Sequence, residues 1–138
     1  MTIAVAQHDS PEGRAALLHA AREAVFQGTS LAVLYVLDHD LPETDQRLEQ
    51  LRRGIGQQLA DAGHEELQWT LHTATDEETR AAALVQLTDT VGADLLVLGS
   101  RRRTPIGKFL LGSTVQRVVL DSPVPVLVVK APHPEQSR

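Results

Sequence analysis

Five short apolar runs alternate along the chain with four longer segments whose apolar residues recur every three or four positions. The short runs predict strands and the longer segments predict amphipathic helices. This alternation is typical of a mostly parallel sheet covered by helices on both faces. The predicted strands are residues 2–7, 30–37, 67–73, 94–99 and 125–130. The predicted helices are residues 11–27, a segment that begins within 38–49 and ends at Gly63, residues 76–91 and residues 112–122.

Right-handed crossovers between such strands give an open, doubly wound α/β sheet of five strands. The 138 residues suffice for one domain of ordinary size, which we place at residues 1–131. Residues 132–138 carry two prolines and polar side chains, and we expect them to form a disordered tail.

Composition excludes several classes of function. The absence of cysteine rules out disulfide frameworks, cysteine-based zinc sites and thiol catalysis. A net charge of -5 and an aromatic content of 3% argue against nucleic-acid binding, because phosphates need cations and bases need stacking partners. Aromatic scarcity also predicts a core of alanine, valine and leucine. No apolar run is long enough to insert into a membrane and no secretory signal is visible, so we expect a cytoplasmic protein.

Chemistry is expected at the carboxyl ends of the first and fourth strands, where the winding of the sheet reverses. Gly99 follows the fourth strand, three arginines come next, and Gly112-Ser113 opens the last helix. Glycines, a helix start and arginines together favour an anion such as phosphate. The alternative is an ordinary strand–helix turn with a solvated basic loop, and the pattern alone leaves both open.

Residues 92–130 resemble the C-terminal signature of the universal stress proteins. The fourth strand ends at Gly99, nine residues separate Arg102 from Gly112-Ser113, and residues 125–129 read Pro-Val-Leu-Val-Val. Residues 10–21 also resemble the first helix of that family. The resemblance implies the strand order 3-2-1-4-5 and, in one branch of the family, binding of ATP or AMP, with Mg²⁺ accompanying ATP.

By this resemblance, the adenosine end of the site is Gln7, His8, Val36 and Leu98, and the phosphate end is Gly99, Arg101, Arg102, Gly112, Ser113 and Thr114. Three positions depart from the nucleotide-binding pattern. His8 stands where binders carry aspartate, Arg102 replaces the second glycine of the turn, and Thr114-Val115 reverses the usual order. His8 is interpreted either as a ligand contact or as an exposed strand end. The other histidines show no metal-ligand spacing, and we expect no metal site built by the protein alone.

The fifth strand lies at a sheet edge in the implied order, and an apolar edge needs a partner. Family members often dimerise through this strand, which implies a homodimer with Val124, Leu127 and Val129 at the interface. Three classes of function remain: a nucleotide-binding regulatory module that acts through an unidentified protein partner, a slow ATP-hydrolysing enzyme, and a stress-response dimer that binds no nucleotide. No nucleophile–base arrangement points to a catalytic residue.

Overall fold

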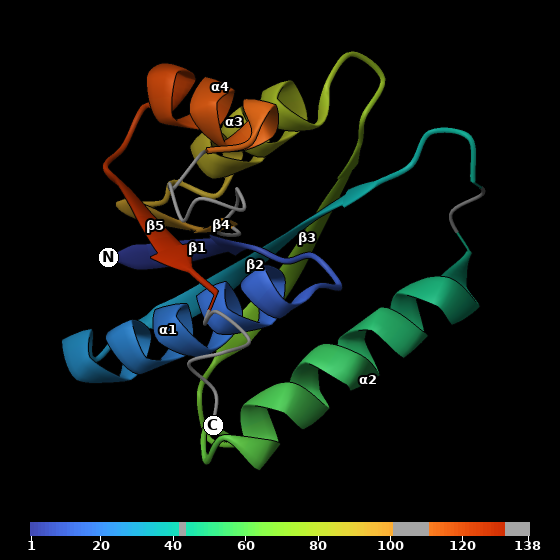
Figure 1. The fold of residues 1–138 in the computed structure, drawn as a ribbon. Coiled ribbons are helices and arrows are strands. Elements are labelled where there is room, and N and C mark those ends of the chain that lie inside the picture. Colours follow the sequence, from blue (N-terminus) through green and yellow to red (C-terminus); the bar gives the residue numbers. More distant parts are fainter. Residues whose placement is uncertain (42–43, 101–110, 132–138) are drawn as a thin grey trace, which may run out of the picture.

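The described residues form a five-stranded parallel sheet with helices on both faces (Figure 1). This computed structural model describes residues 1–41, 44–100 and 111–131. The strands are β1 (Thr2–Ala6), β2 (Ser30–Leu37), β3 (Trp69–Thr75), β4 (Leu95–Ser100) and β5 (Val126–Lys130). The helices are α1 (Pro11–Gln27), α2 (Asp45–Asp61), α3 (Arg80–Thr90) and α4 (Ser113–Asp121). The strand order is β3-β2-β1-β4-β5, which confirms the predicted fold class.

Local sequence signals set the ends of α1 as predicted. The Ser10 hydroxyl accepts a hydrogen bond from the Gly13 N–H at 3.0 Å, and Pro11 occupies the first helical position. Gly28 ends the helix with φ 67°, a left-handed conformation that favours glycine. The path of the chain from β1 into α1 is therefore encoded within a few residues.

Two predicted elements were misplaced by two residues or more. Helix α3 begins at Arg80 rather than at residue 76, because the Thr79 side chain caps it by accepting from the Ala82 N–H at 3.0 Å. The Asp76 carboxylate instead accepts from the backbone N–H of His39 at 2.9 Å. Strand β3 lies two residues later than predicted, because its pairing with the eight-residue strand β2 continues to Leu37 and Thr75.

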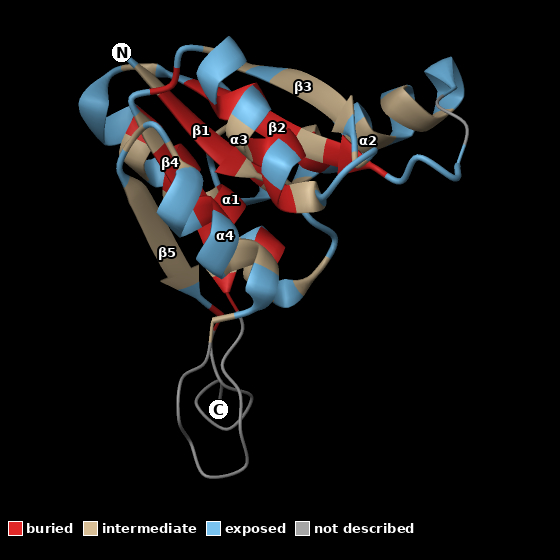
Figure 2. Cartoon of the chain, turned by 90° about the horizontal axis from the view of Figure 1, so that it is seen from above, coloured by how far each residue is buried: buried red, intermediate tan, exposed pale blue. Residues whose placement is uncertain are grey.

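Two apolar clusters hold the helices against the sheet. Ile3, Leu17, Val33, Ile55 and Leu59 lie in the cluster between the sheet and α1 and α2. Leu34, Leu84, Leu87, Leu96 and Val118 lie in the cluster between the sheet and α3 and α4. The largest fully buried side chains are all aliphatic, as the composition predicts, and Figure 2 shows the buried residues along the central strands. None of the described helices is long and apolar enough to cross a membrane.

Candidate ligand-binding site

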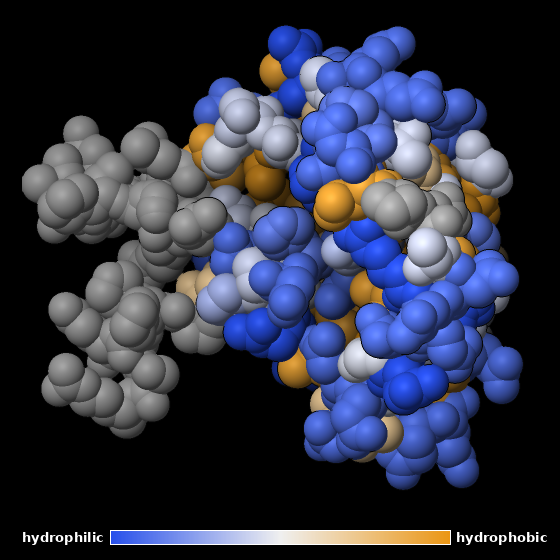
Figure 3. All heavy atoms as spheres, turned by 90° about the vertical axis from the view of Figure 1, so that its right-hand side faces the viewer, coloured by the Kyte–Doolittle hydropathy of each residue, from blue (hydrophilic) through white to orange (hydrophobic). Residues whose placement is uncertain are grey.

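A cavity of about 270 Å³ lies at the carboxyl ends of β1, β2 and β4. Its floor is apolar and consists of Ala6, Val36, Leu84, Leu98 and Val115, which all belong to the cluster beneath α3 and α4. Its rim is polar and includes Gln7, His8, Ser10, Glu12, Arg80 and Thr114. Ligands of open α/β sheets bind at this position, where the chain winding reverses. Figure 3 views the molecule from the side of these strand ends, where small apolar areas lie among hydrophilic side chains.

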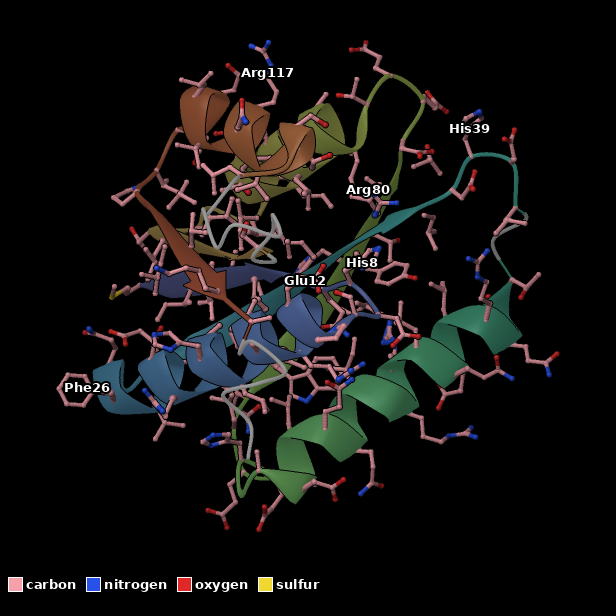
Figure 4. All side chains as sticks on the ribbon, in the orientation of Figure 1. His8, Glu12, Phe26, His39, Arg80 and Arg117 are labelled. Carbon is pink, nitrogen blue, oxygen red and sulfur yellow. The ribbon has the colours of Figure 1, made fainter. Side chains whose placement is uncertain are left out.

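The first turn of α1 packs directly against the ends of β1 and β4. A Cβ atom on Gly13 would lie 2.0 Å from the carbonyl oxygen of His8. A Cβ atom on Gly99 would lie 2.1 Å from the carbonyl oxygen of Glu12. Both glycines therefore permit a backbone contact that a side chain would block, and this contact brings Glu12 and His8 to the rim of the same cavity (Figure 4).

Gln7 brings an unsatisfied hydrogen-bond acceptor to this region. The residue is only 6% exposed and lines the cavity, and its backbone N–H donates to the carbonyl oxygen of Leu34 at 2.8 Å. Its side-chain Oε1 is buried and has no hydrogen-bond partner among the described residues. Such an acceptor costs about 1–3 kcal/mol when unpaired, so a ligand that presents an N–H or O–H donor is favoured here.

Three ionisable side chains line the cavity from two faces of the sheet. His8 follows β1 and is exposed, while Glu12 on α1 and Arg80 on α3 are half-buried. Figure 4 shows His8 and Glu12 where β1 passes into α1, and Arg80 at the start of α3. These positions give the rim hydrogen-bond donors and a carboxylate within one small volume, which suits a polar ligand with an apolar ring.

Gly112 and Thr114 mark the α4 side of the site. Gly112 is the N-cap of α4 with φ -65° and ψ 161°, a conformation open to any residue, and α4 has no side-chain cap hydrogen bond. A Cβ atom on Gly112 would meet nothing within 4 Å among the described residues. Thr114 lines the cavity, whereas Gly112 and Ser113 are exposed residues just before it. Within the described structure, no steric contact therefore requires glycine at position 112.

The cavity brings together most of the residues that the sequence analysis named. Gln7, His8, Val36, Leu98, Gly99 and Thr114 all line it. Gly112 and Ser113 precede the cavity wall at the start of α4, and Arg101 and Arg102 lie outside the described residues.

Sequence reasoning missed Glu12, Gly13 and Arg80. A glycine in the first turn of a predicted helix was the available signal for Gly13, because glycine is unfavourable there unless the backbone makes a close contact. Arg80 gave no signal, since the predicted start of its helix was four residues too early.

His39 joins the loops that follow β2 and β3. Its Nδ1 lies 2.9 Å from a carboxylate oxygen of Asp76, and its Nε2 lies 3.2 Å from Asp40. The hydrogen bond to Asp76, followed by the charge of Asp40, raises the pKa of His39 above its ordinary 6.5. The same hydrogen bond lowers the pKa of Asp76 below 3.8. No local sequence pattern indicates this contact, since Asp76 lies 37 positions from His39.

The His39–Asp76 pair predicts a defined pH dependence. The raised pKa of His39 means that its contribution to stability is complete below pH 6.5 and is lost as the pH rises through the folded value. The lowered pKa of Asp76 means that its contribution is complete above pH 3.8 and is lost as the pH falls through the folded value. We expect Asp76→Asn to lower the pKa of His39 toward 6.5 in an NMR titration. Asp38→Asn, which changes a carboxylate 4.0 Å from the ring, is expected to lower it less, and an equal effect of both variants would contradict the assignment.

Strand β5 lies at the edge of the sheet and is paired with β4 in the described structure. Leu127 and Val129 pack against the cluster beneath α1, and Val124 packs against the opposite cluster. All three are half-buried within this one chain. The free edge of β5 therefore offers backbone groups to a partner strand. The side chains of Val124, Leu127 and Val129, which were predicted at the interface, pack toward the two helix layers.

Comparisons with known proteins agree with this fold. The sequence model described as "Universal stress protein family" matches residues 1–130. A universal stress protein of Mycolicibacterium smegmatis is 38% identical over 136 residues, which cover 95% of this chain and 98% of that protein. The structure of a universal stress protein from Archaeoglobus fulgidus superposes with a TM-score of 0.74 at 26% identity, covering 94% of this chain and 98% of the other. A universal stress protein solved in complex with cAMP has a TM-score of 0.72 at 24% identity, covering 96% and 98%.

Proposed function

The chain belongs to the universal stress protein family, and we propose that it binds an adenine nucleotide, ATP or AMP, as a regulatory module. The observation that carries the proposal is the cavity at the carboxyl ends of β1, β2 and β4, with its apolar floor and polar rim. A structural neighbour solved with cAMP supports the choice of an adenine ligand. In this proposal the module is cytoplasmic, responds to stress and acts through a protein partner.

The floor of the cavity is suited to the base. Val36, Leu84 and Leu98 offer apolar contact to a planar ring, and burial of ring surface contributes about 25 cal/mol per Å². The unpaired Gln7 Oε1 needs a donor, and the exocyclic amino group of adenine is one. Both observations support an adenine ring on this floor.

The rim is suited to the sugar and the phosphates. The Glu12 carboxylate can accept hydrogen bonds from ribose hydroxyls, and His8 stands beside it in place of the family's aspartate. The phosphates would lie over Gly112, Ser113 and Thr114, where backbone N–H groups at the start of α4 attract anions. Arg101 and Arg102 stay predicted phosphate contacts, and Mg²⁺ would accompany the phosphates of ATP.

The volume of the cavity agrees with a base and ribose inside it and phosphates outside it. Small-molecule sites usually enclose roughly 300–1,000 Å³, and about 270 Å³ is near the lower limit. A base and its ribose fill such a space, which leaves the phosphates outside it at the start of α4. A close approach of the phosphates to the start of α4 would also explain the glycine at position 112, which packing among the described residues does not require.

A thermal-shift titration with AMP and with Mg²⁺–ATP tests the proposal. A ligand at 100 times its dissociation constant stabilises the folded state by about 2.7 kcal/mol, which for a domain of this size raises Tm by about 8 °C. UMP serves as the control nucleotide. We expect AMP or ATP to raise Tm well above the effect of UMP, and no rise with either adenine nucleotide would contradict the proposal.

We further propose that two copies pair through β5. The Pro125 carbonyl oxygen accepts from the Leu96 N–H, and the Ala131 N–H donates to the Ser100 carbonyl oxygen, so odd-numbered residues direct their backbone groups toward β4. Alternation then directs the N–H of Val128 toward the free edge. An antiparallel pair of identical edges closes a twofold dimer.

Val128→Pro is therefore expected to abolish dimerisation and leave the protomer folded, because proline is tolerated at sheet edges but cannot donate a hydrogen bond. Sedimentation would report twice the 15.0 kDa mass for the natural chain and a single copy for the variant. A natural chain that sediments as a monomer would refute the dimer.

A further inference from the structure

Arg80 is a half-buried cation on the wall of the cavity, with no described partner. It is the first residue of α3, and its guanidinium makes no hydrogen bond or ion pair within the described ranges 1–41, 44–100 and 111–131. Glu77 and Glu78 lie three and two residues earlier, respectively, yet both are exposed and neither pairs with it. A partly desolvated guanidinium of this kind gains most from a hydrogen-bond acceptor brought by a ligand.

Among the described residues, nothing stabilises a cation at this position. The amino end of a helix carries partial positive charge, which disfavours arginine at the first residue of α3. The first turn of α3 contains no acidic residue that offsets it. A neutral side chain would suit the helix better, so the position of Arg80 is best explained by the cavity that it lines.

The position of Arg80 within the cavity identifies the part of the ligand that it meets. Arg80 and Leu84 are four residues apart and lie on the same face of α3. Leu84 belongs to the apolar floor with Val36 and Leu98, whereas Thr114 marks the α4 end, where the phosphates are placed. Arg80 therefore stands at the edge of the floor on which the base would lie.

We propose that Arg80 is a specificity-determining residue that reads the base of the bound nucleotide, its guanidinium donating hydrogen bonds to acceptor atoms on the edge of the ring. The inference rests on the proposed nucleotide site and adds a base contact to it. Guanidinium N–H groups are donors only, and the ring nitrogens and carbonyl oxygens of bases are their usual partners in direct base recognition. The phosphate contacts remain with the opposite end of the cavity.

Three ligands separate the base from the phosphate. AMP carries both groups, adenosine lacks the phosphate, and ribose 5-phosphate lacks the base. Dissociation constants for each are measured by NMR titration with the natural chain, with Arg80→Met, which keeps the apolar stem of the side chain, and with Arg80→Gln as a second variant. Arg117→Met is the matched control, because Arg117 is an exposed helical arginine of α4 that pairs with Asp121 at 3.9 Å and does not line the cavity.

We expect Arg80→Met and Arg80→Gln to weaken the binding of AMP and the binding of adenosine by the same factor, about tenfold for a lost charge-assisted hydrogen bond. Binding of ribose 5-phosphate should not change, and Arg117→Met should leave all three constants unchanged. The melting temperature without ligand should be equal or slightly higher in both Arg80 variants, which establishes that they fold.

Weaker binding of AMP with unchanged binding of adenosine would place Arg80 on the phosphate and overturn the proposal. No change in any constant would overturn it as well. If the natural chain binds neither AMP nor adenosine, the proposed nucleotide site itself fails, and this result is distinguished from the others without any variant.

Discussion

Gly99→Ala is expected to lower the free energy of unfolding by about 3 kcal/mol. The added methyl group would lie 2.1 Å from the backbone carbonyl oxygen of Glu12, so α1 must move away from β4 to admit it. Helix α1 also contributes Leu17 and four buried alanines to the core, and its displacement would loosen that cluster. A loss of this size is a large part of the roughly 5–15 kcal/mol that stabilises a typical domain.

Denaturation with urea measures the effect, and Gly112→Ala provides the matched control. A Cβ atom on Gly112 meets nothing within 4 Å among the described residues, and its φ of -65° suits any side chain. Gly112→Ala should therefore cost less than about 1 kcal/mol. Gly13→Ala should resemble Gly99→Ala, because its methyl group would lie 2.0 Å from the His8 carbonyl oxygen. Equal stability of Gly99→Ala and Gly112→Ala would contradict the close packing of α1 on β4.

Gly112→Asp is expected to weaken AMP binding about a hundredfold without harming the fold. Aspartate is a preferred N-cap residue, and the N-cap of α4 lacks a side-chain hydrogen bond, so the helix should gain a few tenths of a kcal/mol. The same carboxylate would stand where the proposal places the nucleotide phosphate. Two such charges about 4 Å apart repel by about 4 kcal/mol near a protein surface before salt screens them.

Gly112→Asn isolates the charge in this experiment. Asparagine caps helices as well as aspartate does but carries no charge, so its effect on AMP binding should be much smaller. Calorimetric titration of both variants, with their melting temperatures, separates binding from folding. Equal affinities of the two variants for AMP would show that the phosphate does not approach α4.

Sequence reasoning succeeded where the signal is local. Apolar runs and caps such as Ser10 and Gly28 predicted the elements because a few neighbouring residues set each of them. The predicted start of α3 was wrong because the Asp76 carboxylate accepts a hydrogen bond from the backbone N–H of His39, 37 positions away. No local sequence pattern contains such a contact. The carboxyl ends of β1 and β4 were predicted as the site because parallel topology brings them together regardless of side-chain detail.

The composition of the cavity wall was only partly predictable. Residues at strand ends, such as His8 and Leu98, follow from topology and resemblance. Glu12 and Arg80 come from the first turns of two helices on opposite faces of the sheet, and only tertiary packing brings them to one cavity. Gly99 was assigned to the phosphate end, whereas its contact with Glu12 already accounts for a glycine there. Its role as a phosphate contact stays a prediction.

The most direct test of nucleotide binding in the cavity is an NMR titration of the isotope-labelled chain with AMP, followed through the backbone amide signals. We expect saturable shifts at Gln7, His8, Val36 and Thr114, which line the cavity. Gly28 and Gly63, which line a separate hollow at the other end of the sheet, should not shift. Shifts confined to Gly28 and Gly63, or no shifts at millimolar AMP, would contradict nucleotide binding at the carboxyl ends of β1, β2 and β4.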